Sequence, residues 1–222
     1  MSESTIDVRD LKKSYGEGSS RVEVLKGLSL IIKKGETLAL TGKSGSGKST
    51  LLSLLSGLDR PDSGDIIFQG KNIAGMSEKE LTQFRAAHIG IVFQQFHLIS
   101  TLTAFENVLL PLEILKKENG RQIALNLMES VGLTHRKDHL PSELSGGECQ
   151  RVAIARSLAI SPAILFADEP SGNLDEETGT KVMDLLFQMV EKTNTTLILI
   201  THDPDLARRC ERVVHLEHGR LL

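Results

Sequence analysis

The feature that most constrains the fold is a glycine-rich stretch between an apolar strand pattern and an apolar helix pattern, TLALTGKSGSGKSTLL at residues 37–52. Gly42, Gly47, Lys48 and Ser49 fit the pattern Gly-x-x-x-x-Gly-Lys-Ser. Between a strand and a helix, such glycines let backbone N–H groups surround phosphate oxygens at the positive end of the helix dipole. A glycine-rich turn without a ligand is the alternative. The flanking strand and helix favour an α/β fold with a nucleotide-binding loop.

Each polar position of this loop has an expected partner. Lys48 would reach the β- and γ-phosphates, Ser49 would ligate Mg²⁺, and Thr50 would bond the α-phosphate. The expected ATP-binding residues are Gly42, Ser44, Gly45, Ser46, Gly47, Lys48, Ser49 and Thr50.

A nucleotide-binding loop of this kind works together with an acidic segment on a second strand. The sequence AILFADEP at residues 163–170 is an apolar run that ends in Asp168 and Glu169. Asp168 could hold Mg²⁺ through water, as in phosphate-loop NTPases generally. Glu169 could act as the general base that polarises the water attacking the γ-phosphate. The alternative is a strand that ends in two solvated acids.

Short apolar runs alternate with helical patterns along most of the chain, which is typical of a mainly parallel sheet covered by helices. Expected core strands are 37–40, 89–93, 163–167, 197–201 and 213–216. The first part differs, because 6–11, 22–32 and 65–69 indicate an antiparallel β layer. Expected helices are 48–57, 78–85, 104–115, 121–131, 148–159 and 176–192. Residues 95–160 are too long for an ordinary connection, so we predict an inserted helical subdomain within one domain spanning 1–222.

Net charge, apolar content and cysteine count restrict the partners and the cellular location expected for this chain. The net charge is −3 with no basic tail, which argues against a nucleic-acid partner. No window approaches the twenty apolar residues that a membrane span needs, and the N-terminus lacks the apolar core of a signal peptide. Two cysteines cannot form a disulfide framework, so a reducing cytoplasmic setting is expected.

The segment LSGGECQR, residues 144–151, poses a separate question. Ser145 and Glu148 have the spacing of a capping box at a helix start. A capping box does not need two glycines, and Gly146 and Gly147 weaken the turn they begin. Some other group is therefore expected to approach this backbone closely. A reactive Cys149 at the helix start is a further alternative.

The phosphate loop, the helical insertion, LSGGECQR, FADEP and ITHD, in this order, resemble the nucleotide-binding subunit of an ABC transporter over essentially the whole chain. The resemblance implies an ABC ATPase that hydrolyses ATP with Mg²⁺ and binds a second copy of itself through ATP. It implies that Ser145, Gly146 and Gly147 contact the γ-phosphate held by that second copy. Cys149 stands where the family usually has Gln.

The resemblance assigns further residues one by one. Tyr15 matches the aromatic residue that stacks on adenine, with a half-buried structural ring as the alternative. Gln94 matches the glutamine that reaches Mg²⁺ and the attacking water, with Gln95 as its rival. His202 matches the switch histidine at the γ-phosphate, and capping of the next helix is its alternative. SGNLD, residues 171–175, matches the loop that crosses the dimer interface.

The runs FRAAHIGIVFQQFHLISTLTAFENVLLPL and FADEPSGNLDEETG resemble the lipoprotein-releasing and macrolide-exporting group, with its YbbA, LolD, MacB and FtsE types. This implies a membrane permease with a large extracytoplasmic domain as partner, contacted through residues 94–115. It places the chain on the cytoplasmic face of the inner membrane. A soluble ABC ATPase with a non-membrane partner and a solute-uptake subunit remain the alternatives.

Overall fold

The chain divides into two compact units. The computed structural model describes residues 4–222, apart from the side chains of Ser4 and Ser19. The first unit contains the chain up to Arg85 together with Thr196–Leu222, and the second contains Ala86–Thr195. The range 95–160, expected to form a helical insertion, lies inside the second unit. That the whole chain is one domain stays a prediction.

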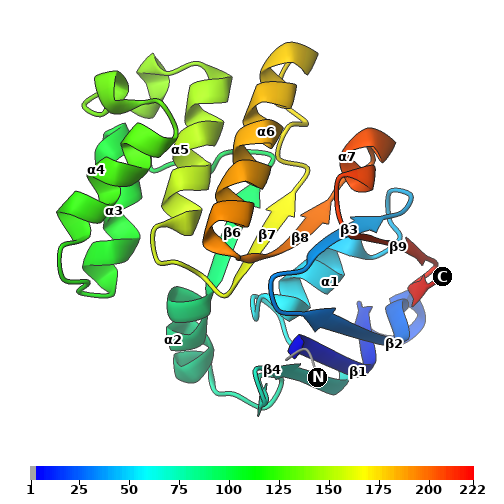
Figure 1. The fold of residues 1–222 in the computed structure, drawn as a ribbon. Helices are drawn as coiled ribbons and strands as arrows, with labels where there is room; N and C mark the ends of the chain where they lie inside the picture. The colour runs from blue at the N-terminus through cyan, green and yellow to red at the C-terminus, as the bar shows by residue number, and fades with distance from the viewer. Residues whose placement is uncertain (1–3) are drawn as a thin grey trace. The chain divides into compact units, whose positions relative to one another are not determined.

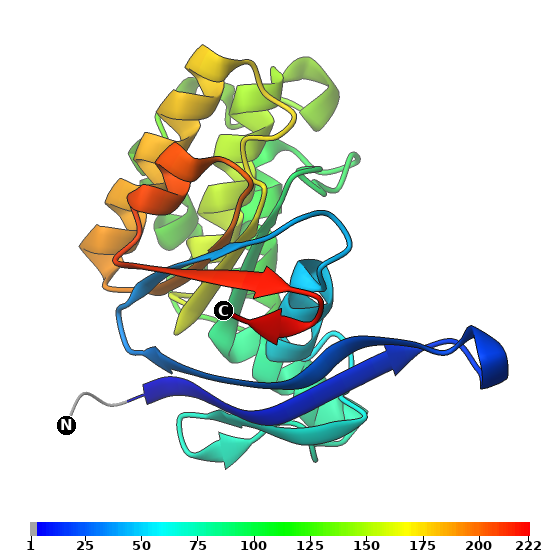
Figure 2. The same cartoon turned by 90° about the vertical axis from the view of Figure 1, so that its right-hand side faces the viewer.

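An antiparallel layer in the first unit has the strand order β2, β1, β4, β5 (Figure 2). Its strands are β1 (Ser4–Tyr15), β2 (Val22–Lys33), β4 (Ser63–Phe68) and β5 (Lys71–Asn72). In β2, Leu28, Leu30 and Ile32 are buried while Ser29 and Ile31 are exposed. This period of two places one face of the strand in the core. The predicted antiparallel layer is confirmed.

The first unit also contains parallel strands. β3 (Thr37–Thr41) lies between β8 (Thr196–Ile200) and β9 (Arg212–Glu217) and is parallel to both. β10 (Arg220–Leu221) pairs with β9 in the antiparallel sense. All residues of β8 are buried, as expected for a parallel strand covered on both faces. The helices that lie or begin in this unit are α1 (Lys48–Leu55), α2 (Glu78–His88) and α7 (Pro204–Arg208).

In the second unit, β6 (Ile89–Phe93) and β7 (Ile164–Asp168) are parallel, with Phe93 opposite Asp168. The helices are α3 (Ala104–Ile114), α4 (Gly120–Ser130), α5 (Gly146–Leu158) and α6 (Glu176–Thr193). Helix α5 packs against α3, α6 and β6 (Figure 1). Because parallel strands end at the same edge of a sheet, the residues that follow β6 and β7 are brought together.

Two features differ from the sequence prediction. Helix α5 begins at Gly146 rather than at residue 148, because Ser145 is its N-cap and the two glycines form its first turn. The structure also contains β5, β10 and α7, which are two to five residues long and are not predicted from the sequence. Elements this short show too few residues for a hydrophobic period to be recognised.

Candidate functional site

The glycine-rich loop connects β3 to α1 in the first unit. Gly47 is the N-cap of α1, with a left-handed φ of 107° and no side-chain cap. Ser44 and Gly45 are exposed in the loop, while Ser49 is exposed and Thr50 half-buried in the first turn of the helix. The first N–H groups of a helix have no partner within it and carry partial positive charge. The loop therefore presents donors suited to phosphate oxygens.

Internal contacts hold this loop in shape. Nζ of Lys48 donates to the carbonyl oxygens of Gly42 at 2.8 Å and Lys43 at 3.0 Å. A Cβ on Gly42 would overlap the carbonyl oxygen of Leu216, so β9 requires glycine at this position. Ser46 Oγ is buried and has no hydrogen-bond partner in the part of the chain that the structure describes. A buried hydroxyl without a partner suits an external acceptor such as a phosphate oxygen.

Tyr15, at the end of β1, is 44% exposed. Its hydroxyl donates to Asp59 Oδ2 at 2.8 Å, and Lys13 Nζ lies 5.0 Å from the ring centroid. The pKa of Tyr15 is raised by burial and then by the Asp59 carboxylate, while the Thr50 hydroxyl acts in the opposite direction. The phenol is therefore protonated and lies beside the first turn of α1, with part of its ring open to a ligand.

His202 follows β8 in the first unit and is exposed. The next residue, Asp203, is the N-cap of α7, and its Oδ1 accepts from the N–H of Asp205 at 2.7 Å. The Asp203 N–H in turn donates to Thr201 Oγ1 at 3.0 Å. Because Asp203 performs the capping, the alternative role of His202 as the helix cap is wrong.

Two carboxylates mark the end of β7 in the second unit. Asp168 is the last residue of the strand, and Glu169 follows with a left-handed φ of 44°. Non-glycine residues adopt this conformation at an energetic cost, and such residues gather at functional sites. The Gly172 N–H donates to the Glu169 carbonyl oxygen at 2.9 Å, which closes a turn just beyond the carboxylate. Both side chains are half-buried.

Gln94, directly after β6, is paired with Asn173 through two hydrogen bonds. Asn173 Nδ2 donates to the Gln94 carbonyl oxygen at 3.1 Å, and Gln94 Nε2 donates to Asn173 Oδ1 at 3.0 Å. The first bond fixes which end of the Asn173 amide carries the oxygen, so the second fixes the orientation of the Gln94 amide. Gln94 Oε1 is thereby directed away from Asn173. Its rival Gln95 is exposed.

The start of α5 confirms the capping box predicted at LSGGECQR. The Glu148 N–H donates to Ser145 Oγ at 3.3 Å, and the Ser145 N–H donates to Glu148 Oε2 at 2.8 Å. The Ser145 N–H is the main cause of the lowered pKa of Glu148. Arg136 Nε adds an ion pair to Glu148 at 3.2 Å. Ser145 and Gly146 are nevertheless exposed, so this capped helix start faces outward.

Gly147 has a reason to be glycine within this chain. It is buried, and a Cβ at this position would overlap Cγ2 of Thr178 in α6. At Gly146, a Cβ would lie 3.2 Å from Leu174 Cδ2. At Gly147, the group that comes close to the backbone is therefore Thr178 of α6, which packs against α5.

Gly147→Ala should lower the free energy of unfolding by about 1–3 kcal/mol, because the added methyl group overpacks the contact with Thr178. Thermal unfolding followed by circular dichroism measures the change. Adding Thr178→Ser removes the obstructing methyl group and should restore the wild-type midpoint, and Thr178→Ser alone is the control. A single Gly147→Ala variant as stable as the wild type would contradict this account.

Cys149 is buried in α5, and its Sγ donates to the Pro141 carbonyl oxygen at 3.5 Å. Burial raises the pKa of this thiol, and the Glu148 carboxylate raises it further. A buried, protonated thiol is a poor nucleophile. The alternative of a reactive cysteine at the helix start is therefore wrong.

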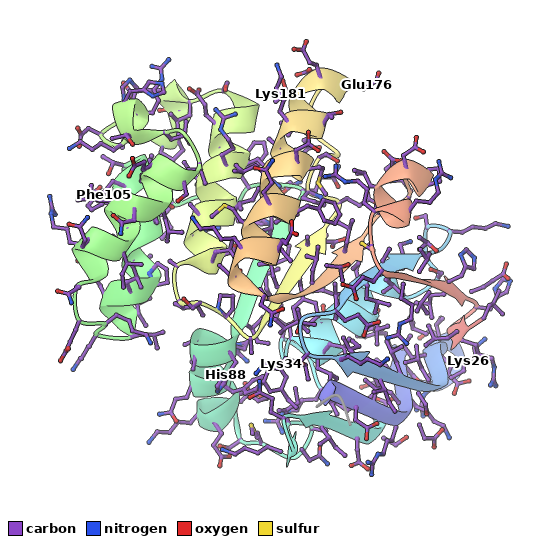
Figure 3. The ribbon with its side chains drawn as sticks, viewed as in Figure 1. Lys26, Lys34, His88, Phe105, Glu176 and Lys181 are labelled. Carbon is purple, nitrogen blue, oxygen red and sulfur yellow. The ribbon has the colours of Figure 1, made fainter. Side chains whose placement is uncertain are left out.

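The segment 94–115, expected to face a membrane protein, is partly core. Phe105, Val108 and Leu112 of α3 are buried; Phe105 is labelled in Figure 3. Thr103 and Glu106 form the predicted capping box. The exposed large apolar side chains of the segment are Ile99 and Ile114, at 40% and 65% exposure. In residues 4–222, no helix combines the length and apolar character that a membrane span requires.

Sequence reasoning missed two residues of α5. Gln150 is buried, and its Nε2 donates to the carbonyl oxygens of Phe93 and Pro170. Arg156 donates to the carbonyl oxygens of Phe96 and His97 in the segment after β6. A polar side chain on the apolar face of QRVAIARSLA is the signal that could have identified Gln150.

The structure thus assembles the predicted residues in two groups. In the first unit, Tyr15 and the phosphate loop meet at Thr50, and His202 follows β8. In the second unit, Gln94 lies beside the ends of β6 and β7, and residues 145–147 start α5.

Comparison with known proteins agrees with these arrangements. The family model described as "ABC transporter" matches residues 25–172. The chain is 50% identical to the uncharacterized ABC transporter ATP-binding protein YbbA of Escherichia coli K12, over 99% of this chain and 97% of that protein. It is 48% identical to the lipoprotein-releasing system ATP-binding protein LolD of Geobacter metallireducens, over 99% and 98%.

Solved structures give the same result. The ATP-binding cassette MJ0796, in a dimeric post-hydrolysis state bound to ADP and Pi, matches with a TM-score of 0.89 and 40% identity, over 97% of this chain and 96% of that chain. This confirms the predicted ABC ATPase fold, with its antiparallel layer, parallel strands and helical insertion. The chain is therefore a member of the ABC transporter family, an ATP-binding subunit of the group that contains the YbbA and LolD proteins.

Proposed function

We propose that residues 1–222 form one ABC ATPase domain that hydrolyses ATP and drives a membrane permease of the lipoprotein-release or macrolide-export type. The observation that carries this proposal is the exposed, capped start of α5 at Ser145 and Gly146. Such a helix start supplies donors for a phosphate. In a dimer, the phosphate loop of one copy and the start of α5 of the other copy together form one nucleotide site, so the dimer has two such sites.

Phosphate binding falls to the loop and α1. Lys48 donates to the β- and γ-phosphates, exchanging its present carbonyl acceptors for charged oxygens. Backbone N–H groups of residues 42–47 and the Thr50 hydroxyl bind the remaining oxygens. Ser49, Asp168 and Gln94 offer hydroxyl, carboxylate and amide oxygens, the donor types that Mg²⁺ prefers. When bound, the ion neutralises charge on the phosphates.

The remaining residues handle water and closure. Glu169 accepts a proton from the attacking water, Gln94 Oε1 orients that water, and His202 donates to the γ-phosphate. Ser145, Gly146 and Gly147 contact the nucleotide of a second copy. The dimeric state of MJ0796 with ADP and Pi supports this assembly. The burial of Gly147 leaves Ser145 and Gly146 as the more accessible donors.

Tyr15→Ala should weaken ATP binding by about 5- to 150-fold, because base stacking on an aromatic ring contributes about 1–3 kcal/mol. Titration calorimetry with ATP measures the change, and kcat should persist at saturating ATP. Tyr15→Phe is the matched control, since it keeps the ring and loses only the hydroxyl bond to Asp59. Equal affinities of the Ala and Phe variants would remove Tyr15 from the adenine site.

The expected partner is a permease with a large extracytoplasmic domain, bound at the cytoplasmic face of the inner membrane. The LolD relative, named for a lipoprotein-releasing system, supports this choice. Exposed Ile99 and Ile114 offer apolar contacts for docking.

A pull-down from detergent-solubilised membranes, using tagged Glu169→Gln protein with Mg-ATP, tests the partner. Mass spectrometry should recover a permease with a large external domain, and Ile114→Asp should reduce its yield. Recovery of soluble or ribosomal proteins without any membrane protein would support the soluble alternative. Recovery of a solute-uptake permease would support the alternative that the chain is a subunit of a solute-uptake transporter.

A further inference from the structure

Gln150 forms hydrogen bonds to the backbone beside Gln94 and beside Glu169, the two residues that act on the attacking water in the proposed function. Its side chain in α5 is 0% exposed. Nε2 donates to the Phe93 carbonyl oxygen at 3.2 Å and to the Pro170 carbonyl oxygen at 2.6 Å. Phe93 directly precedes Gln94, and Pro170 directly follows Glu169. One amide nitrogen therefore joins the chain segments that carry the two groups.

Two other side chains of α5, Ser157 and Arg156, form hydrogen bonds to β6 or to the segment that follows it. Ser157 Oγ donates to the Ile91 carbonyl oxygen at 2.6 Å. Arg156 donates to the carbonyl oxygens of Phe96 at 3.1 Å and His97 at 2.7 Å. These bonds fix α5 against β6 and the segment after it. Gln150 adds a bond to the segment after β7, so it contributes to the spacing of the two strand ends, together with the pairing of β6 and β7 and the Gln94–Asn173 bonds.

The cost of burying this amide indicates that its donors matter. Gln150 Oε1 is buried without a hydrogen-bond partner among the described residues. An unpaired buried polar atom destabilises a fold, and an apolar side chain of similar size would avoid that cost. Both hydrogens of Nε2, in contrast, have acceptors. Packing alone therefore does not account for glutamine at this position.

We infer that Gln150 is a positioning residue for ATP hydrolysis, which holds Gln94 and Glu169 at the separation that the attacking water requires. This inference rests on the proposed function of those two residues. Gln150 touches neither nucleotide nor water in this role and acts through the carbonyl groups of Phe93 and Pro170. Catalysis is sensitive to such spacing, because a misplacement of about 1 Å costs about 100-fold in rate.

Gln150→Met tests the inference, because it removes both donors and keeps an unbranched side chain of similar length. We expect kcat to fall by about 10- to 100-fold, while the Kd for ATP, measured by calorimetry, and KM stay near wild type. Ser157→Ala is the matched control. It removes a bond from the same helix to the same strand and should lower the thermal midpoint without lowering kcat.

A Gln150→Met variant with wild-type kcat would overturn the inference. So would a loss of kcat that Ser157→Ala shares at equal loss of thermal stability, since that pattern indicates a merely structural role. If Gln150→Met does not fold, Gln150→Leu decides, because it also removes both donors and buries no charge. Wild-type kcat in that variant would also overturn the inference.

The rate of ATP hydrolysis by Glu169→Gln distinguishes failure of the proposed general-base role of Glu169 from failure of the positioning role of Gln150. If Glu169→Gln hydrolyses ATP normally, the proposed role of Glu169 fails, whatever Gln150 does. If Glu169→Gln is inactive and Gln150→Met is fully active, only the positioning role fails.

Discussion

Glu169→Gln is expected to slow ATP hydrolysis by about 10²- to 10⁴-fold, the contribution of a positioned general base. An amide of the same shape cannot accept the proton from the attacking water, while the contacts of the phosphate loop are unchanged. ATP binding should therefore persist, and the ATP-bound dimer should accumulate because it no longer opens through hydrolysis. The left-handed backbone at Glu169 supports this assignment, since such strain gathers at functional sites.

Phosphate release and size-exclusion chromatography with light scattering, each with Mg-ATP, measure the two effects of this substitution. Glu191→Gln is the matched control, because Glu191 is an exposed carboxylate near the end of α6. It should leave both turnover and the monomer–dimer distribution unchanged. Turnover by Glu169→Gln at near wild-type rates would show that another group is the base.

Lys48→Ala is expected to weaken ATP binding by about 10- to 150-fold, because a hydrogen bond to a charged group contributes about 1.5–3 kcal/mol. In the proposed site, this loss includes the attraction between the ammonium group and the two phosphates. Hydrolysis should fall further, since in the proposed function Lys48 also stabilises charge that develops on the phosphates in the transition state.

Fluorescence titration with a labelled nucleotide measures the affinity of Lys48→Ala. Thermal unfolding without nucleotide checks that losing the bonds to Gly42 and Lys43 has not unfolded the loop region. Lys34→Ala is the control, since Lys34 is exposed in the turn between β2 and β3 (Figure 3). Wild-type affinity in Lys48→Ala would remove Lys48 from the phosphate site.

The glycine pair at the start of α5 illustrates how one motif serves two demands. Gly147 allows α6 to approach through Thr178, while Gly146 remains exposed beside the capping Ser145. The first demand belongs to folding of the single chain. The second suits a ligand supplied from outside, which we propose is the nucleotide of a second copy. Substitutions at the two glycines should therefore differ, with stability affected mainly at Gly147.

Sequence reasoning succeeded where a residue's task depends on its immediate neighbours. The phosphate loop, the capping boxes at Thr103 and Ser145 and the acidic end of β7 are all local patterns. For His202 the sequence left helix capping open as an alternative to the switch role, and the structure excludes that alternative because Asp203 performs the capping. A run of apolar residues does not reveal which side of a helix is covered, so only the structure shows that Phe105, Val108 and Leu112 of α3 are buried while Ile114 is exposed.

The sequence by itself determined the α/β fold, the order of its elements and the residue types that can bind phosphate, because hydrophobic period and loop chemistry act over a few residues. Only the tertiary structure decided that Asn173 orients the Gln94 amide, that Thr178 requires glycine at position 147, and that Gln150 joins the ends of two strands. These contacts link residues 20 to 79 positions apart. Their geometry depends on how helices pack on strands, which no local pattern encodes.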